Sequence, residues 1–181
     1  MVFTVLTPEH PALQEILKKT ADLPTCFVGR AQVVEDGSML ACFRGVRPPT
    51  DEEFETFMIQ FKLVCKLVQK ENFAFNLLLE VCPSGNITFD QALRVSSYLR
   101  KKRTLVRNHL KGTIVMIHSP LVKMIVDAVM NVIPNVKPFE TLMIEQHEHE
   151  GRDDFGLNPR LKKYVMDKYN TFPWPEECTD D

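Results

Sequence analysis

The most informative part of the sequence is residues 75–103, which read FNLLLEVCPSGNITFDQALRVSSYLRKKR. The mostly continuous apolar run at 73–81 is typical of a central strand that is covered on both faces. A polar loop follows, and then Thr88 with Gln91 three residues later, which is a helix-start pattern. We therefore predict a buried strand, a loop and a helix that runs to about Asn108.

The rest of the chain extends this unit into a sheet. Two β-rich runs at 27–35 and 38–43 are separated by Asp36-Gly37, which favours a hairpin because glycine accepts the positive φ of a tight turn. Further strands are predicted at 112–118 and 139–145, and further helices at 11–19, 50–70, 120–133 and 157–169. The alternation predicts an α/β fold: a four- to five-stranded mixed sheet, with an N-terminal hairpin and then parallel strands, backed by helices.

Bulk composition narrows the class of protein. The chain has 181 residues, of which 44% are hydrophobic, and this suits one globular domain. Its net charge of -2 provides no overall electrostatic attraction for polyanions. The apolar run at the N-terminus stops at Thr7-Pro8, too short for a signal peptide or a membrane span. Five cysteines form no CxxC pair, so we expect reduced thiols and an intracellular, reducing compartment. Those at 42, 65 and 82 lie in apolar segments and are expected to be buried.

Several motifs in order carry a family resemblance. They are RGV at 44–46, FAFNLLLEV at 73–81, TFDQALRVSSYLRKKR at 88–103, LKGTIVMIHSPLVKMIVDAV at 110–129 and KPFETLMIEQ at 137–146. With these motifs the chain resembles the STAS family, in the branch related to CRAL-TRIO lipid-binding domains. The resemblance implies a sheet used for binding rather than catalysis. It divides the chain into a helical lead-in (1–24), a STAS-like α/β domain (25–146) and a C-terminal extension with a short helix and a Pro/Trp docking tail (147–181).

One candidate site lies where two predicted strands end, the edge at which α/β sheets bind ligands. Cys82 and His118 could there be a nucleophile and its base. The backbone N–H groups of Ser84, Gly85 and Asn86 could be oxyanion donors or a phosphate cradle. The alternative is a strand-end thiol followed by a turn, with His118 capping the next helix. We favour that alternative, because no third orienting residue supports catalysis.

A second candidate is the basic half of the predicted helix after the central strand, with Arg94, Arg100, Lys101, Lys102, Arg103 and Arg107. Favourable interaction with the helix dipole is a sufficient structural cause for several of them. Four consecutive cations span almost a full turn, so we expect one of them to lie along the core with its stem buried. A solvated face is the favoured interpretation, and the functional alternative is contact with phosphoinositide headgroups, nucleic acid or an acidic protein surface. Because Tyr98 is the only aromatic residue in this helix, we do not expect nucleic acid.

Three weaker signals remain. His147 and His149 could hold zinc with a third ligand, although an exposed polar strand end is favoured. Trp174 lies between prolines and either packs back on the domain or extends over a neighbouring chain, which is the prediction we adopt. Apolar helix residues could line a lipid cavity, although core packing explains most of them; they include Met58, Ile59, Met124, Val126, Met130 and Ile133.

Together these features predict a non-enzymatic protein-interaction or scaffold module that belongs to a larger assembly. We expect other protein chains as partners, no catalytic residues, no cofactor and no metal. The alternative is a CRAL-TRIO-like domain that binds a lipid, either a phosphoinositide or an acyl chain, or an anionic membrane surface.

Overall fold

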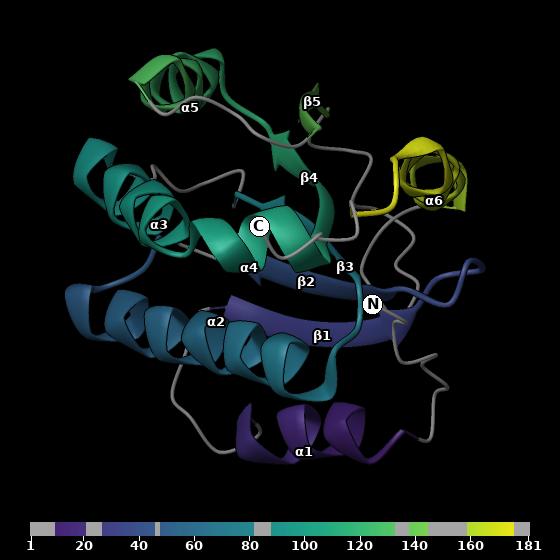
Figure 1. Cartoon of the computed structure of the whole chain (residues 1–181). Coiled ribbons are helices and arrows are strands. Elements are labelled where there is room, and N and C mark those ends of the chain that lie inside the picture. The colour runs from purple at the N-terminus through teal and green to yellow at the C-terminus, as the bar shows by residue number, and fades with distance from the viewer. Residues whose placement is uncertain are drawn as a thin grey trace.

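One five-stranded sheet organises the chain (Figure 1). A computed structural model describes residues 10–20, 27–45, 48–81, 88–132, 138–144 and 159–175. The strands lie side by side in chain order: β1 (Phe27–Val33), β2 (Met39–Gly45), β3 (Phe75–Glu80), β4 (Leu110–Ile117) and β5 (Phe139–Met143). β1 is antiparallel to β2, and β2 to β5 are all parallel to one another. The predicted α/β class, with an N-terminal hairpin followed by parallel strands, is confirmed.

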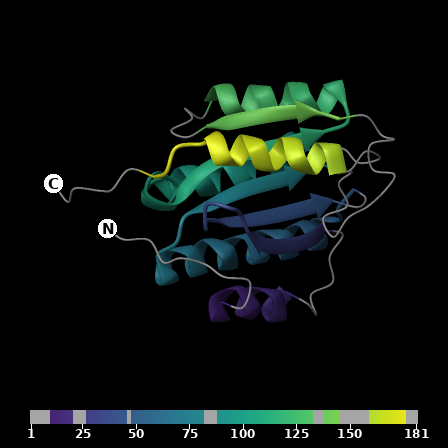
Figure 2. The ribbon, with the colours of Figure 1, turned by 90° about the vertical axis from the view of Figure 1, so that its right-hand side faces the viewer.

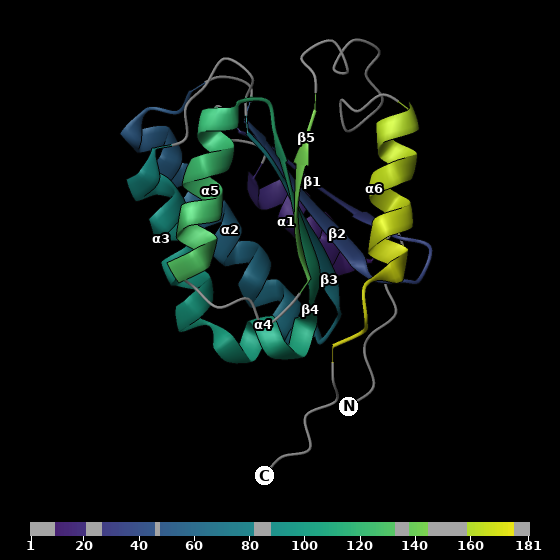
Figure 3. The same cartoon turned by 90° about the horizontal axis from the view of Figure 1, so that it is seen from above.

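Helices cover both faces of this sheet. In chain order they are α1 (Pro11–Thr20), α2 (Asp51–Glu71), α3 (Phe89–Lys101), α4 (Arg103–His109), α5 (Pro120–Val132) and α6 (Pro159–Thr171). Right-handed crossovers between successive parallel strands place their helices on one face, and α2 to α5 lie there. α6 crosses in front of the strands on the other face (Figures 2 and 3), and α1 packs against β1 and α2.

Local sequence signals explain the main boundaries. Gly37 has a φ of 82° and donates to the carbonyl of Val34 at 2.9 Å, which closes the predicted hairpin turn. Thr50 accepts from the backbone N–H of Glu53 at 3.3 Å, and the Glu53 carboxylate accepts from the N–H of Thr50 at 2.9 Å. This reciprocal cap begins α2 at the expected residue, and Thr88 with Gln91 begins α3 in the same way.

The predicted single helix from Thr88 to about Asn108 is wrong. α3 ends at Lys101, and Lys102 leaves the helical conformation with φ of −104° and ψ of 41° before α4 begins at Arg103. The new direction buries Leu105 in the core. Arg100 to Arg103 are all exposed, and the expectation that one of these cations packs its stem along the core stays a prediction.

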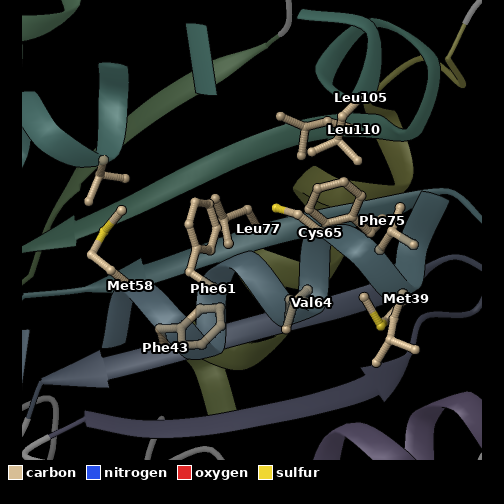
Figure 4. Packing of buried hydrophobic residues seen from close by; sticks show 14 of the residues in the cluster. Met39, Phe43, Met58, Phe61, Val64, Cys65, Phe75, Leu77, Leu105 and Leu110 are labelled. Atoms are coloured by element: carbon tan, nitrogen blue, oxygen red, sulfur yellow. The ribbon is translucent and has the colours of Figure 1, made fainter. Parts of the chain in front are cut away.

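Apolar clusters on both faces hold the helices on the sheet. On the α2 side, Phe43 of β2 meets Phe61 of α2 edge to face, with ring centroids 5.8 Å apart, in a cluster that includes Cys65 and Leu77 (Figure 4). On the opposite side, Tyr169 of α6 is fully buried, and its hydroxyl donates to the carbonyl of Leu77 at 2.6 Å. Both faces of the central strand are therefore covered, as its continuous apolar sequence predicts.

Candidate binding surface

Exposed cations gather where α3 ends and α4 begins. Residues 91–126 contain eight Lys or Arg and no Asp or Glu. Five of these cations are exposed around the α3–α4 junction, and we call them the basic surface: Arg100, Lys101, Lys102, Arg103 and Arg107. Arg100 and Lys101 end α3, Lys102 is the break, and Arg103 and Arg107 belong to α4. The structure thus groups five of the six predicted basic residues.

The other three cations of residues 91–126 form ion pairs. Arg94 pairs with Glu55 of α2 at 2.5 Å, Lys123 pairs with Asp127 one turn away at 2.5 Å, and Lys111 pairs with Asp36. None of the five cations of the basic surface forms an ion pair with another described residue. Their charge is therefore available to an external anion.

The helix dipole accounts for only part of this arrangement. Arg100 and Lys101 lie in the last turn of α3, where a cation is favourable. Lys102 and Arg103, however, also begin α4, whose first turn contains no acidic residue and whose dipole disfavours cations there. Mutual repulsion within the basic surface is therefore only partly offset within the chain. An anionic partner would relieve it.

The aromatic ring beside the basic surface is engaged internally. Tyr98 of α3 packs edge to face on Phe61, with ring centroids 5.8 Å apart, and the ammonium of Lys62 lies 6.0 Å from its centroid. Burial and the adjacent Cys65 raise the pKa of the Tyr98 hydroxyl to about 12. Burial also raises the pKa of Cys65 to about 12, so this thiol is not ionised at neutral pH. Cys42 and Cys65 are buried as predicted.

His118 belongs to a different cluster, at the carboxyl ends of the parallel strands. Its Nε2 lies 3.7 Å from Oε1 of Glu80, and Nε of Arg44 lies 3.3 Å from Oε2 of the same carboxylate. Arg44 and Glu80 face each other in the β2–β3 register. Both were missed, although aligning the predicted parallel strands would have placed them together. Cys82, Ser84 and Gly85, the other residues predicted at this edge, lie outside the described residues.

The C-terminal tail packs on its own domain as far as Pro175, which is buried. Trp174 is 44% exposed, and one face of its ring lies 5.0 Å from the ammonium of Lys111. The ring of Phe172 lies against Gly112 on β4. Through Pro175 the tail thus packs on its own domain, and a contact of the exposed part of Trp174 with a neighbouring chain stays a prediction. Trp174 is not part of the basic surface. His147 and His149 lie outside the described residues.

The residues suggested for a lipid cavity divide between the core and the outside. Met58 and Val126 are buried in packed clusters. Ile59 and Met124 are 58% and 68% exposed, so the suggestion that they line an interior cavity is wrong. The structure leaves the side chain of Met130 undescribed, and Ile133 lies outside the described residues.

The described residues contain neither a metal-binding group nor a helix that could span a membrane. No group of three or more His, Cys, Asp or Glu side chains there is placed to hold a metal ion. None of the helices there combines the length and the apolar composition that crossing a bilayer requires.

The fold and its exposed cations define an α/β domain with a basic surface on its helical layer. No protein-family model, curated protein or solved structure matches the chain. The resemblance to the STAS family therefore stays a prediction.

Proposed function

We propose that the chain is a non-enzymatic protein-interaction module within a larger assembly, and that its basic surface binds an acidic region of a partner protein. The observation that supports this proposal most directly is the group of five exposed cations that form no ion pair with described residues. Complementary charge of this kind steers association and selects the partner, and it contributes to affinity once water is excluded by neighbouring contacts.

Two observations favour an acidic protein over nucleic acid. Tyr98 packs on Phe61, so the aromatic residue beside the basic surface is engaged with the core rather than presented for base stacking. Outside residues 91–126 the chain has more acidic than basic residues, since the net charge of the whole is -2. This excess repels an extended polyphosphate that reaches beyond the basic surface.

The buried thiols support binding rather than covalent chemistry. Cys42 and Cys65 are buried, and the raised pKa of Cys65 leaves its thiol protonated at neutral pH. The polar cluster at the strand ends is internally compensated in charge, because the guanidinium of Arg44 pairs with the carboxylate of Glu80.

The test compares three polyanions with matched charge variants. The full chain is titrated with a glutamate-rich helical peptide, a short DNA duplex, and phosphatidylcholine vesicles carrying phosphatidylinositol bisphosphate, at about 0.15 M salt. The variant Arg100→Gln/Lys101→Gln/Arg103→Gln removes three charges from the basic surface. The control Lys18→Gln/Lys19→Gln/Lys163→Gln removes three exposed charges from α1 and α6.

We expect the peptide to bind the native chain and the control alike, and the basic-surface variant about tenfold more weakly. Tighter binding of the duplex or of the vesicles than of the peptide, lost in the same variant, would replace the proposal by nucleic-acid or lipid recognition. If the native chain, the basic-surface variant and the control bind the peptide equally well, the basic surface does not bind it.

A further inference from the structure

Exposed apolar side chains lie at the opposite end of α3 from the basic surface. Phe89 begins α3 and is 50% exposed, and Leu121 of α5 is 57% exposed, close in sequence to the exposed Met124. α3 and α5 pack against each other, and α3 lies between α2 and α5 (Figure 1). Each helix follows the carboxyl end of a strand, so both begin at the same edge of the sheet.

Helical spacing places the apolar side chains of α3 on the side away from α2. Arg94 contacts Glu55 and Tyr98 contacts Phe61, so these two residues mark the side of α3 that faces α2. Ala92 and Val95 are buried and mark the side that faces the sheet. At 100° per residue, Phe89 and the half-buried Leu93 then lie on the remaining side, towards α5.

α5 has a matching division. Val122, Val126 and Val129 are buried against the sheet. The Lys123–Asp127 ion pair lies on one flank of the helix, Leu121 lies on the other, and Met124 points outward between them. Because α5 is right-handed and runs antiparallel to the strands, this apolar flank faces α3. We call Phe89, Leu93, Leu121 and Met124 the apolar surface.

The apolar surface and the basic surface lie along one outer face of the helical layer. From Phe89 to Arg100 the rise of α3 is about 16 Å, which equals about three turns of a helix. Single exposed apolar residues are ordinary, but several large ones at one end of two adjacent helices mark an interaction site. An occupant that covers both surfaces needs apolar groups at one end and negative charge at the other.

We propose that the two surfaces together bind one acidic amphipathic helix of the partner protein. This rests on the proposed function, because it assigns the chemistry of the acidic partner. The apolar side chains of the partner helix pack on Leu121, Met124 and Phe89, and its carboxylates reach the basic surface about three turns away. The charge complementarity comes from residues 91–126, which contain eight cations and no acidic residue. Buried apolar anchors contribute most of the affinity when an amphipathic helix binds another protein.

The experiment uses the full chain and synthetic helical peptides of about 16 residues. The first peptide has leucines at helical spacing in one half and glutamates in the other, and it is made with both orders of the halves. The second replaces the leucines by serine, and the third replaces the glutamates by glutamine. The protein variant is Leu121→Ser/Met124→Ser. Its control is Ile59→Ser, which removes an equally exposed apolar side chain from α2.

We expect one order of the first peptide to bind about tenfold more tightly than the serine peptide. Leu121→Ser/Met124→Ser should remove that advantage and leave the affinity for the serine peptide unchanged, which also shows that the variant is folded. Ile59→Ser should change neither affinity.

Each other outcome is decisive. If the serine peptide binds the native chain as tightly as the leucine peptide, the amphipathic helix is excluded while the proposed acidic partner stands. If the glutamine peptide alone binds, the basic surface is not used and both proposals fail. If no peptide binds, both proposals fail as well.

Discussion

The ammonium of Lys111 on β4 pairs with the carboxylate of Asp36, which lies 75 residues earlier in the β1–β2 turn. Lys111 is fully buried, and its ammonium also donates to the backbone carbonyl of Tyr169 at 3.3 Å. One side chain thus joins the hairpin turn, the sheet and the end of α6. A buried charge is tolerated here because it is both paired and hydrogen-bonded.

A β-bulge turns Lys111 towards α6. Phe75 of β3 faces Leu110, but Asn76 faces Gly112, so Lys111 is an extra residue in β4. Leu110 belongs to the core under α2, whereas Gly112 contacts Phe172 on the α6 side. Because a bulge interrupts the alternation of side chains, Lys111 joins Gly112 on the α6 side.

Replacing only one partner of the Lys111–Asp36 pair should lower the free energy of unfolding more than replacing both. Asp36→Asn leaves a buried ammonium without its carboxylate, and we expect a loss of about 3 kcal/mol in the free energy of unfolding. Asp36→Asn/Lys111→Met should be more stable than Asp36→Asn alone, as measured by urea denaturation. Asp167→Asn, which breaks the exposed Lys163–Asp167 pair, should cost less than about 1 kcal/mol. If Asp36→Asn and Lys111→Met lower the free energy of unfolding additively, the two side chains are not coupled.

Acid should weaken the same contact. Burial opposes ionisation of Asp36, but hydrogen bonds from Lys111 and Ser38 outweigh it and lower the pKa of this carboxyl. Its stabilisation is complete above the unfolded-state pKa of about 3.9 and is lost as the pH falls below that through the lowered folded pKa. Stability measured between about pH 5 and pH 2 should therefore fall more gently in Asp36→Asn than in the native chain. An unchanged slope would contradict the assignment.

His109 should weaken the fold at a higher pH. Burial lowers the pKa of this imidazole, and the carbonyl of Phe73, 3.3 Å from Nδ1, offsets that only in part. The unfolded chain then takes up the proton first, so stability should decline as the pH falls below about 6.5. His109→Gln should flatten the pH dependence of thermal unfolding between about pH 7 and pH 5. If His109→Gln keeps the native pH dependence in this range, the dependence must come from another histidine.

Gly112 should be required for the packing of the tail. A Cβ at this position would overlap the ring of Phe172 and lie 3.0 Å from the carbonyl oxygen of Pro138. We expect Gly112→Ala to destabilise the fold by about 1–3 kcal/mol and to displace the tail. Trp174 is the only tryptophan, so its emission should shift to longer wavelength as it loses the contact with Lys111. In the Phe172→Ala background, Gly112→Ala should cost less stability than in the native chain, since the overlap with the ring is gone and only the approach to the Pro138 carbonyl oxygen remains.

Local signals in the sequence were sufficient for most of the fold. Asp36-Gly37 and the caps at Thr50 and Thr88 act over a few residues, and each is found as predicted. The break at Lys102 was missed because helical spacing continues through it, with neither proline nor glycine to mark it.

The contacts that organise the sites are long-range. The Arg44–Glu80 pair depends on strand register, and the Lys111–Asp36 pair depends on a bulge, which periodicity does not reveal. The basic residues themselves were evident from composition. That they are exposed and form no ion pair with other described residues required the fold, because Arg94 and Lys111 carry the same charge and are paired.

The central claim is that the chain recognises an acidic protein through the basic surface. Its most direct measurement is affinity purification of the tagged full chain from its native cells, with co-purified proteins quantified by mass spectrometry. The comparison is between the native chain, the Arg100→Gln/Lys101→Gln/Arg103→Gln variant and the Lys18→Gln/Lys19→Gln/Lys163→Gln control. We predict a partner with an acidic segment that the native chain and the control retain alike and the basic-surface variant loses by about tenfold. Equal recovery of the same proteins with all three would contradict the claim.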